Sequence, residues 1–358
     1  YRALDANTTA DNNVAIGQAA LGANTTGSDN TAVGKNAGLS VTTGIQNTIV
    51  GTYAGDALTD ADYNTAMGVY ALGSDTLGSR NTAIGRSALS SQNFTSATDS
   101  NNTAVGFYAG LSVTTGTNNT FVGTLAGDAT DDGHSNVAVG YEALSANCGY
   151  ENTAVGNNAL KAVTGIQNTA VGTLAGLNIT SGGNNVFIGR DAGITGSPGG
   201  NTVTASNKLG LGDENISAAH IQVDWTVASD ARDKTDFTAL DLGLDFVKAL
   251  APVTYKWDKR AKYGDKYADD YDLNAQTPDG THKEDWLDIG FKAQEVQALE
   301  EAAGYTAAAK KNLTVSTSED NKQMGLQYSK FIPILVKAIQ EQNALIEALT
   351  ARVTTLEG

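Results

Sequence analysis

Residues 30–38 read Asn-Thr-Ala-Val-Gly-Lys-Asn-Ala-Gly, and residues 47–55 repeat the pattern as Asn-Thr-Ile-Val-Gly-Thr-Tyr-Ala-Gly. The unit occurs eleven times, at intervals of 16 or 17 residues with one interval of 21. Its first residues are Asn13, Asn30, Asn47, Asn64, Asn81, Asn102, Asn119, Asn136, Asn152, Asn168 and Asn185. Every copy has a glycine four places on, an alanine seven places on, and an apolar residue before the glycine. This array predicts a solenoid of stacked coils.

Each position of the unit has a physical role in such a stack. Asn-Thr-Ala-Val predicts a short strand whose side chains alternate between two faces. The glycine allows a turn where a Cβ would clash, and the small alanine suits a crowded interior. The period predicts one coil with two short strands, and stacking would place equivalent asparagines in hydrogen-bonded ladders. Eleven coils at roughly 4.8 Å each predict a rod about 50 Å long.

The repeats resemble the β-roll head of trimeric autotransporter adhesins, whose unit is also Asn-x-Val/Ala-x-Gly. The resemblance covers residues 12–193 and implies a trimeric parallel β-roll. The repeats here are longer than those of that family, so we expect longer loops. The extra residues at 90–101 predict one enlarged loop.

Composition restricts the classes of function. The 358 residues include 40 glycines, 17% charged and 7% aromatic residues, which suits tight turns better than one large core. A net charge of −16 argues against nucleic acid or anionic membrane as a partner. No apolar run is long enough for membrane insertion. The one cysteine, Cys148, and three scattered histidines give no zinc spacing, so we expect no metal and no cofactor.

The chain is expected to be mainly β, with an α+β domain and a coiled coil after the shaft. We assign residues 1–193 to the β-roll shaft and 194–228 to a connector whose residues 221–227 alternate like a strand. Residues 229–330 form the α+β domain, in which 240–250 predicts a helix, 252–257 a strand, and 289–296 a strand running into a helix. Because the chain starts at Tyr1 without Met or a signal peptide, we expect an attachment segment upstream.

Residues 331–358 predict a helix with a heptad seam. The seam positions, at alternating spacings of four and three, are Leu335, Ile339, Gln342, Ile346, Leu349, Val353 and Leu356. This spacing indicates a coiled coil, in which Gln342 would fix register or strand number. A single amphipathic helix packed on its own domain is the alternative.

Residues 228–234 read Ala-Ser-Asp-Ala-Arg-Asp-Lys, where the composition of the chain changes. The segment resembles the start of the intramolecular chaperone domain of phage endosialidases, peptidase family S74, typically Ser-Asp-x-Arg-x-Lys. The resemblance continues through residues 250–257, 290–296 and 326–328, so four motifs occur in order. Asp233, where many members carry an apolar residue, and the polar insertion at 263–283 depart from the family pattern.

The resemblance implies a domain that guides trimerisation of the fibre before it and then cuts itself free in a single turnover. The scissile bond would be Ala228–Ser229, with Ser229 as nucleophile and Lys234 as base. A serine hydroxyl needs a neighbour to take its proton, and a lysine does so only in its neutral form, which burial or nearby positive charge favours. Asp230 and Arg232 would support the site. A serine and a lysine at this spacing are also common by chance, and Ser-Asp is an ordinary turn or helix cap.

The favoured function is a phage tail fibre or spike subunit, located in the virion and extracellular. Expected partners are two further copies of the chain, upstream fibre or baseplate proteins, and a host surface glycan or receptor. A bacterial trimeric adhesin, a structural filament and a polysaccharide-degrading tailspike are the alternatives. An adhesin is expected to end in membrane-anchor strands, whereas the last residues here predict a coiled coil.

Two further groups of residues in the shaft are weaker candidates. Aromatic residues beside the repeat glycines would either stack on sugars or pack between coils or subunits: Tyr53, Tyr70, Phe107, Tyr108 and Tyr141. Asp128, Asp131 and Asp132 near Gly133 would either hold calcium or line a solvated turn.

Overall fold

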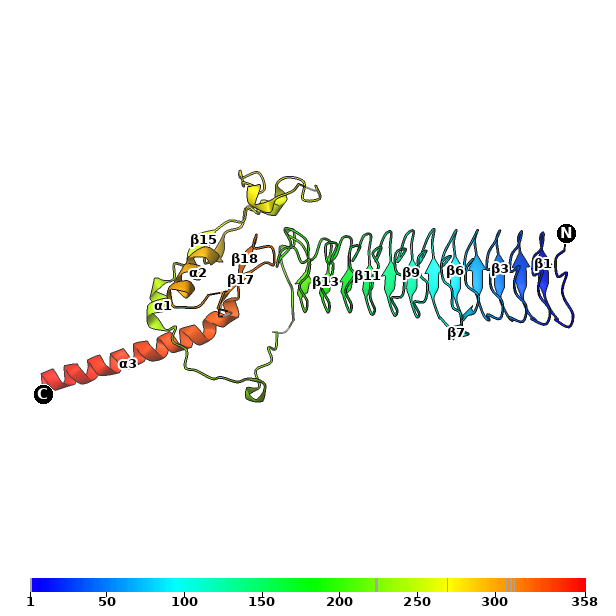
Figure 1. Ribbon diagram of the computed structural model, residues 1–358. Helices are drawn as coiled ribbons and strands as arrows, with labels where there is room; N and C mark the ends of the chain where they lie inside the picture. The colour runs from blue at the N-terminus through cyan, green and yellow to red at the C-terminus, as the bar shows by residue number, and fades with distance from the viewer. Residues whose placement is uncertain (1, 223–224, 269, 307, 310, 312) are drawn as a thin grey trace. The chain divides into compact units, whose positions relative to one another are not determined.

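The structure is a computed structural model that describes residues 2–222, 225–268, 270–306, 308–309, 311 and 313–358. The chain divides into two compact units, the first ending at Asp213 and the second beginning at Glu214. The first unit is a parallel β-solenoid and the second is a small α+β unit with a long C-terminal helix (Figure 1).

One parallel sheet of twelve strands runs through the first unit in chain order (Figure 1). Its strands are β1 (Val14–Ile16), β2 (Thr31–Val33), β3 (Thr48–Val50), β4 (Thr65–Met67), β6 (Thr82–Ile84), β8 (Thr103–Val105), β9 (Thr120–Val122), β10 (Val137–Val139), β11 (Thr153–Val155), β12 (Thr169–Val171), β13 (Val186–Ile188) and β14 (Leu209–Leu211). Equivalent residues pair in every step, so Ala32 lies opposite Ile49 and Ile49 opposite Ala66. The predicted solenoid is confirmed.

Each coil contributes one strand to this sheet, and for most coils it is the only strand, so the expectation of two strands per coil is wrong for most of the shaft. The rest of the coil consists of turns, because residues such as Leu21 (φ 49°) and Asn36 (φ 58°) leave the extended conformation. These turns still bond to the next coil, as when Leu21 N–H donates to Ala37 C=O at 3.0 Å. A short extra pair, β5 (Gly78–Ser79) with β7 (Thr98–Asp99), involves the enlarged loop predicted at 90–101.

The solenoid continues one coil further than the repeats indicate. Strand β14 pairs in parallel with β13, so the first part of the predicted connector 194–228 belongs to the shaft. Lys208 stands where the other coils have asparagine, and its N–H donates to Asn185 Oδ1 at 2.9 Å. Gly212 keeps the glycine position, with φ 71°. The missing asparagine and an interval of 23 residues hide this coil in the sequence.

Buried asparagines form the predicted ladder along the stack. The backbone N–H of Asn47 donates to Asn30 Oδ1 at 2.9 Å, and the N–H of Asn64 donates to Asn47 Oδ1 at 2.9 Å. The Asn47 Nδ2 group donates to Ala61 C=O within its own coil at 2.8 Å. Each side chain therefore satisfies backbone groups that burial would otherwise leave without partners.

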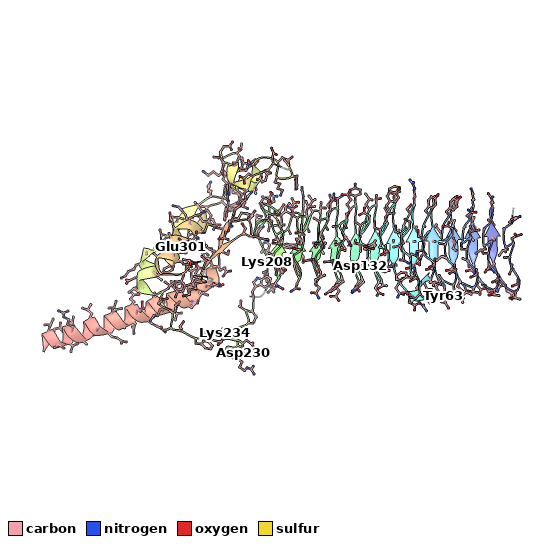
Figure 2. All side chains as sticks on the ribbon, viewed as in Figure 1. Tyr63, Asp132, Lys208, Asp230, Lys234 and Glu301 are labelled. Atoms are coloured by element: carbon pink, nitrogen blue, oxygen red, sulfur yellow. The ribbon has the colours of Figure 1, made fainter. Side chains whose placement is uncertain are left out.

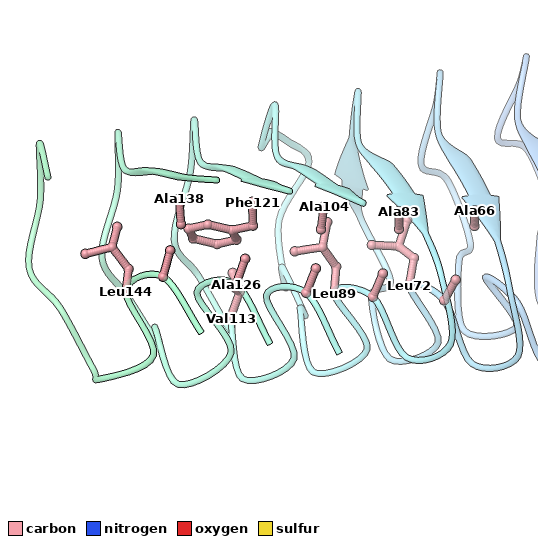
Figure 3. Packing of buried hydrophobic residues seen from close by; sticks show 14 of the residues in the cluster. Ala66, Leu72, Ala83, Leu89, Ala104, Val113, Phe121, Ala126, Ala138 and Leu144 are labelled. Atoms are coloured by element: carbon pink, nitrogen blue, oxygen red, sulfur yellow. The ribbon is translucent and has the colours of Figure 1, made fainter. Parts of the chain in front are cut away.

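The interior of the solenoid is narrow and filled by complementary sizes. The repeat alanines at the seventh place, from Ala20 to Ala192, are buried. Where a coil carries Phe121 at its strand centre, glycines occupy the facing positions, and a Cβ at Gly127 would lie 2.5 Å from the Phe121 ring. Where the strand centre is alanine, a leucine fills that space instead: Figure 3 shows Leu72 below Ala83 and Leu89 below Ala104. The size of one side chain is thereby matched to the size of the residue that faces it, as close packing requires.

Replacing the repeat glycine of one coil is expected to destabilise the shaft. Gly106 has φ 148°, and a Cβ there would lie 2.3 Å from Gly123 O in the next coil. The backbone strain alone costs about 1–3 kcal/mol, and the overlap adds to it. Gly106→Ala should lower the thermal unfolding midpoint of the shaft, measured by circular dichroism on the full chain. Gly73→Ala is the control, because its Cβ would lie 3.3 Å from the nearest atom, Tyr70 O, and its backbone is not in the positive-φ region. Equal midpoints for the two variants would contradict the prediction.

The second unit combines short helices with two small antiparallel sheets. Its main elements are α1 (Leu244–Ala249), β15 (Val253–Tyr255), β16 (Asp288–Gly290), α2 (Ala293–Ala302), β17 (Val315–Thr317), β18 (Met324–Leu326) and α3 (Phe331–Glu357). Single 3-10 turns lie at Ala231–Asp233 (η1), Arg260–Lys262 (η2), Leu273–Ala275 (η3) and Tyr328–Lys330 (η4). Strand β15 pairs with β16, and β17 pairs with β18. The predicted helix, strand and strand–helix segments are confirmed within a few residues.

The helix α3 begins inside the core of this unit. Phe331 and Ile334 pack with Leu242, Phe246 and Val296, so the boundary placed at 330/331 does not separate two domains. From Gln342 onward every residue of the helix is exposed. The alternative of a helix packed on its own domain therefore holds only for its first turns, and the rest of the predicted seam is without a partner in the single chain.

The strand expected at 221–227 is not formed by the residues that the structure describes there. Val223 and Asp224 lie outside the described residues, and Ile221, Gln222 and 225–227 have no strand conformation. Trp225 and Val227 are 68% and 78% exposed. Alternation alone does not make a strand when no neighbouring strand is there to accept its hydrogen bonds.

Candidate functional site

Ser229 and Lys234 lie on an exposed segment at the start of the second unit, and a tight turn brings them together. The turn is η1, and the backbone N–H of Lys234 donates to Ala231 C=O at 3.3 Å. Asp230 caps this turn because its carboxylate accepts from the Arg232 N–H at 2.9 Å. Figure 2 shows Asp230 and Lys234 close together on this segment. The local sequence is therefore sufficient to fold the chain back on itself.

The Lys234 Nζ group donates a hydrogen bond to Ser229 Oγ at 2.6 Å. This distance is within the range needed for proton transfer between a nucleophile and its base. Ala228, Ser229 and Lys234 are all exposed in the single chain, and so are their neighbours from Trp225 to Thr238. The pair is thus formed by the chain alone, but nothing within the described chain covers it.

Asp230 and Arg232 form an ion pair beside this turn. The Arg232 guanidinium reaches Asp230 Oδ2 at 2.6 Å, which lowers the pKa of the Asp230 carboxyl and raises that of Arg232. Because the guanidinium is neutralised by its own neighbour, it supplies little of the positive charge expected to favour a neutral Lys234. The geometry instead gives Asp230 and Arg232 a positioning role, since both hold the turn between Ser229 and Lys234.

The other three motifs of the resemblance come together in the core of the second unit. Residues 250–257 contain β15, which pairs with β16, and the last residue of β16, Gly290, begins the motif 290–296. Phe291 stacks against Tyr328 and Phe331, with ring centroids 6.3 and 5.4 Å apart. The Tyr328 hydroxyl accepts from the Phe291 N–H at 3.2 Å. These motifs form the structural centre of the unit, and they are not assembled around Ser229 in the single chain.

Sequence reasoning missed two polar contacts that stabilise this centre. Trp257 Nε1 donates to Asp288 Oδ2 at 3.3 Å across the β15–β16 pair. The carboxylate of Glu341 on α3 accepts from the Leu244 N–H at 2.7 Å, where α1 begins, and this bond lowers the Glu341 pKa. Glu341 precedes a seam position by one residue, but nothing in the spacing indicates that it caps a helix 97 residues away.

The weaker candidates of the shaft contact their near neighbours, and two of the aromatic residues stack between coils. Asp131 accepts from Thr114 Oγ1, while burial raises the pKa of Asp128. Within the described ranges no group of three or more His, Cys, Asp or Glu side chains is placed to hold a metal ion. Among the aromatics, Tyr53 and Tyr70 stack with ring centroids 5.3 Å apart, and the ring centroids of Phe107 and Tyr108 are 3.9 Å apart.

No helix among the described residues has the length and apolar character to span a membrane.

The chain thus consists of a β-solenoid shaft and a small α+β unit that carries the Ser229–Lys234 pair. A scan against family models matches residues 229–305 to Peptidase_S74, described as the chaperone of endosialidase. The match begins at Ser229 itself. Searches of curated proteins and of solved structures gave no match to the chain. The S74 match and the solenoid before it are consistent with a fibre that ends in a chaperone domain.

Proposed function

We propose that this chain is a phage tail fibre or spike subunit whose C-terminal unit drives assembly and then releases itself by cutting the Ala228–Ser229 bond. The observation that carries the proposal is the 2.6 Å contact between Lys234 Nζ and Ser229 Oγ, in a segment where the S74 family match begins. The shaft would be the part retained in the particle, outside the cell. Host attachment through a surface glycan or receptor belongs to the same proposal.

The reaction would start with attack of Ser229 Oγ on the carbonyl carbon of Ala228, through a five-membered ring. Lys234, in its neutral form, takes the hydroxyl proton and passes it to the departing Ser229 amide nitrogen. The C–N bond breaks as the C–O bond forms, which leaves Ala228 as an ester on Ser229 with a free amine. Water then hydrolyses the ester and restores the serine hydroxyl. No oxidant, metal or cofactor enters this balance.

Exposure of the pair in the single chain supports a site that becomes active on assembly. Solvent favours the charged form of a lysine, whereas burial favours the neutral form that can act as base. Copies of the chain packing around residues 225–238 would provide that burial. The uncovered part of α3, with Ile346 and Leu349 54% and 63% exposed, offers a seam for three such copies to wind together.

The test is denaturing electrophoresis of the freshly produced full chain, followed by N-terminal sequencing of the products. We expect a fragment comprising residues 229–358 that begins Ser-Asp-Ala-Arg, and light scattering should give the mass of three chains before denaturation. A chain that stays intact at Ala228–Ser229 while fully trimeric would contradict self-release. A chain that is monomeric at micromolar concentration would contradict the assembly part.

A further inference from the structure

The outer face of the twelve-stranded sheet carries a continuous ladder of apolar residues and no charged residue along its whole length. In each strand the central residue is the most buried and the two flanking residues point outward. The third residues are Ile16, Val33, Val50, Met67, Ile84, Val105, Val122, Val139, Val155, Val171, Ile188 and Leu211. Several are well exposed, such as Ile16 at 61% and Ile188 at 47%. The first residues are threonine in eight strands and valine or leucine in the other four.

None of these 24 outward positions carries a charged residue. The whole chain is 17% charged, so about four would be expected by composition. A parallel sheet normally has both of its faces covered, and a large exposed apolar patch marks an interaction surface. Contact with water therefore does not explain why this face carries no charged residue.

The register of the sheet restricts what can cover this face. Parallel in-register pairing places Val33, Val50 and Met67 directly above one another, repeated at about 4.8 Å over twelve strands. A partner must present an equally long, uncharged surface that follows the same repeat. Another copy of this chain, running in the same direction, offers such a surface. The chain's net charge of −16 would oppose close approach of copies elsewhere, but it is absent from this face.

We propose that copies of this chain associate along the shaft through the outward face of the twelve-stranded sheet, with the ladder from Ile16 to Leu211 at the contact. The proposal rests on the fibre assembly proposed above and assigns the surface that assembly uses in the shaft. Residues in the turns, such as Thr115 and Asn157, would stay exposed in the assembly. The shaft would then have one surface in the contact between copies and another in contact with solvent.

Cysteine labelling of the purified full chain tests this directly. The sequence has one cysteine, Cys148, which is buried and gives the background. Val122→Cys places a thiol on the ladder at a position that is 37% exposed in the single chain, and Thr115→Cys places one on an exposed turn. We expect maleimide to label Val122→Cys at least about tenfold more slowly than Thr115→Cys, because labelling would require local separation of the copies. A short bismaleimide should link chains through residue 122 but not through 115.

Equal labelling rates at the two positions would overturn the proposal, and so would protection of residue 122 in material that is monomeric by light scattering. Val171→Cys, outward and 40% exposed, repeats the test if the first variant folds poorly. The readout does not depend on release of residues 229–358, so failure of self-cleavage and failure of this interface are seen separately. If residue 122 is labelled freely in the trimer but becomes protected when lipid vesicles or a host extract are added, the face binds another partner and the proposal is wrong.

Discussion

Replacement of Ser229 by alanine is expected to stop release of the 229–358 fragment completely while trimers still form. The alanine side chain has no oxygen to attack the Ala228 carbonyl, so neither the ester nor its hydrolysis can follow. Lys234→Arg should reduce the rate by about 10²–10⁴, because a guanidinium keeps a similar reach and charge but stays protonated and cannot act as base. Band intensities over time on denaturing gels measure both effects.

Two variants serve as controls for this pair of substitutions. Ser217→Ala removes another exposed hydroxyl close to the start of the second unit, and Lys248→Arg changes an exposed lysine that pairs with Asp245. Both should release the fragment at the rate of the unaltered chain. Hydroxylamine adds a chemical check, since it cleaves the ester intermediate and should speed release and leave Ala228 as a hydroxamate. Normal cleavage in both Ser229→Ala and Lys234→Arg would show that the pair is not the reacting pair.

The solenoid could be read from the sequence because its determinants are local and repeated. The asparagine, glycine and alanine positions each answer one constraint of stacking, and the structure uses them as expected in Asn47, Gly51 and Ala54. The number of strands per coil could not be read in this way. It depends on the positive φ of residues such as Leu21 and Asn36, which the type of side chain does not predict. The twelfth coil was hidden because Lys208 replaces the asparagine and only its backbone N–H is needed.

The candidate site also has a local part and a part that depends on residues far away in the sequence or in other copies of the chain. The turn that joins Ser229 and Lys234 is local, but the two residues were singled out by the resemblance to the S74 domain, because their spacing alone is common by chance. Its environment is not local, because burial of that turn would depend on other copies of the chain. The contacts that unite the remaining motifs, such as Phe291 N–H with the Tyr328 hydroxyl, involve residues far apart in the sequence and have no periodic signal.

Removal of one rung of the asparagine ladder is expected to have the largest effect on stability. Asn119 accepts from the Asn136 N–H at 2.9 Å through Oδ1 and donates to Gly133 C=O at 2.8 Å through Nδ2. In Asn119→Ala both buried backbone groups lose their partners, at about 1–3 kcal/mol each, so the loss should total about 2–6 kcal/mol. Denaturant unfolding of the full chain, followed by circular dichroism, should show this as a lower midpoint for the shaft.

Asn119→Asp separates the two bonds, because a carboxylate can still accept from Asn136 N–H but cannot donate to Gly133 C=O. It also buries a charge, so we expect it to be at least as destabilising as the alanine variant. Asn157→Ala, at an exposed position on the same shaft, is the control and should change the midpoint little. If Asn119→Ala and Asn157→Ala unfold alike, the ladder contributes no specific stability, and the coils must be held by their backbone hydrogen bonds and alanine core alone.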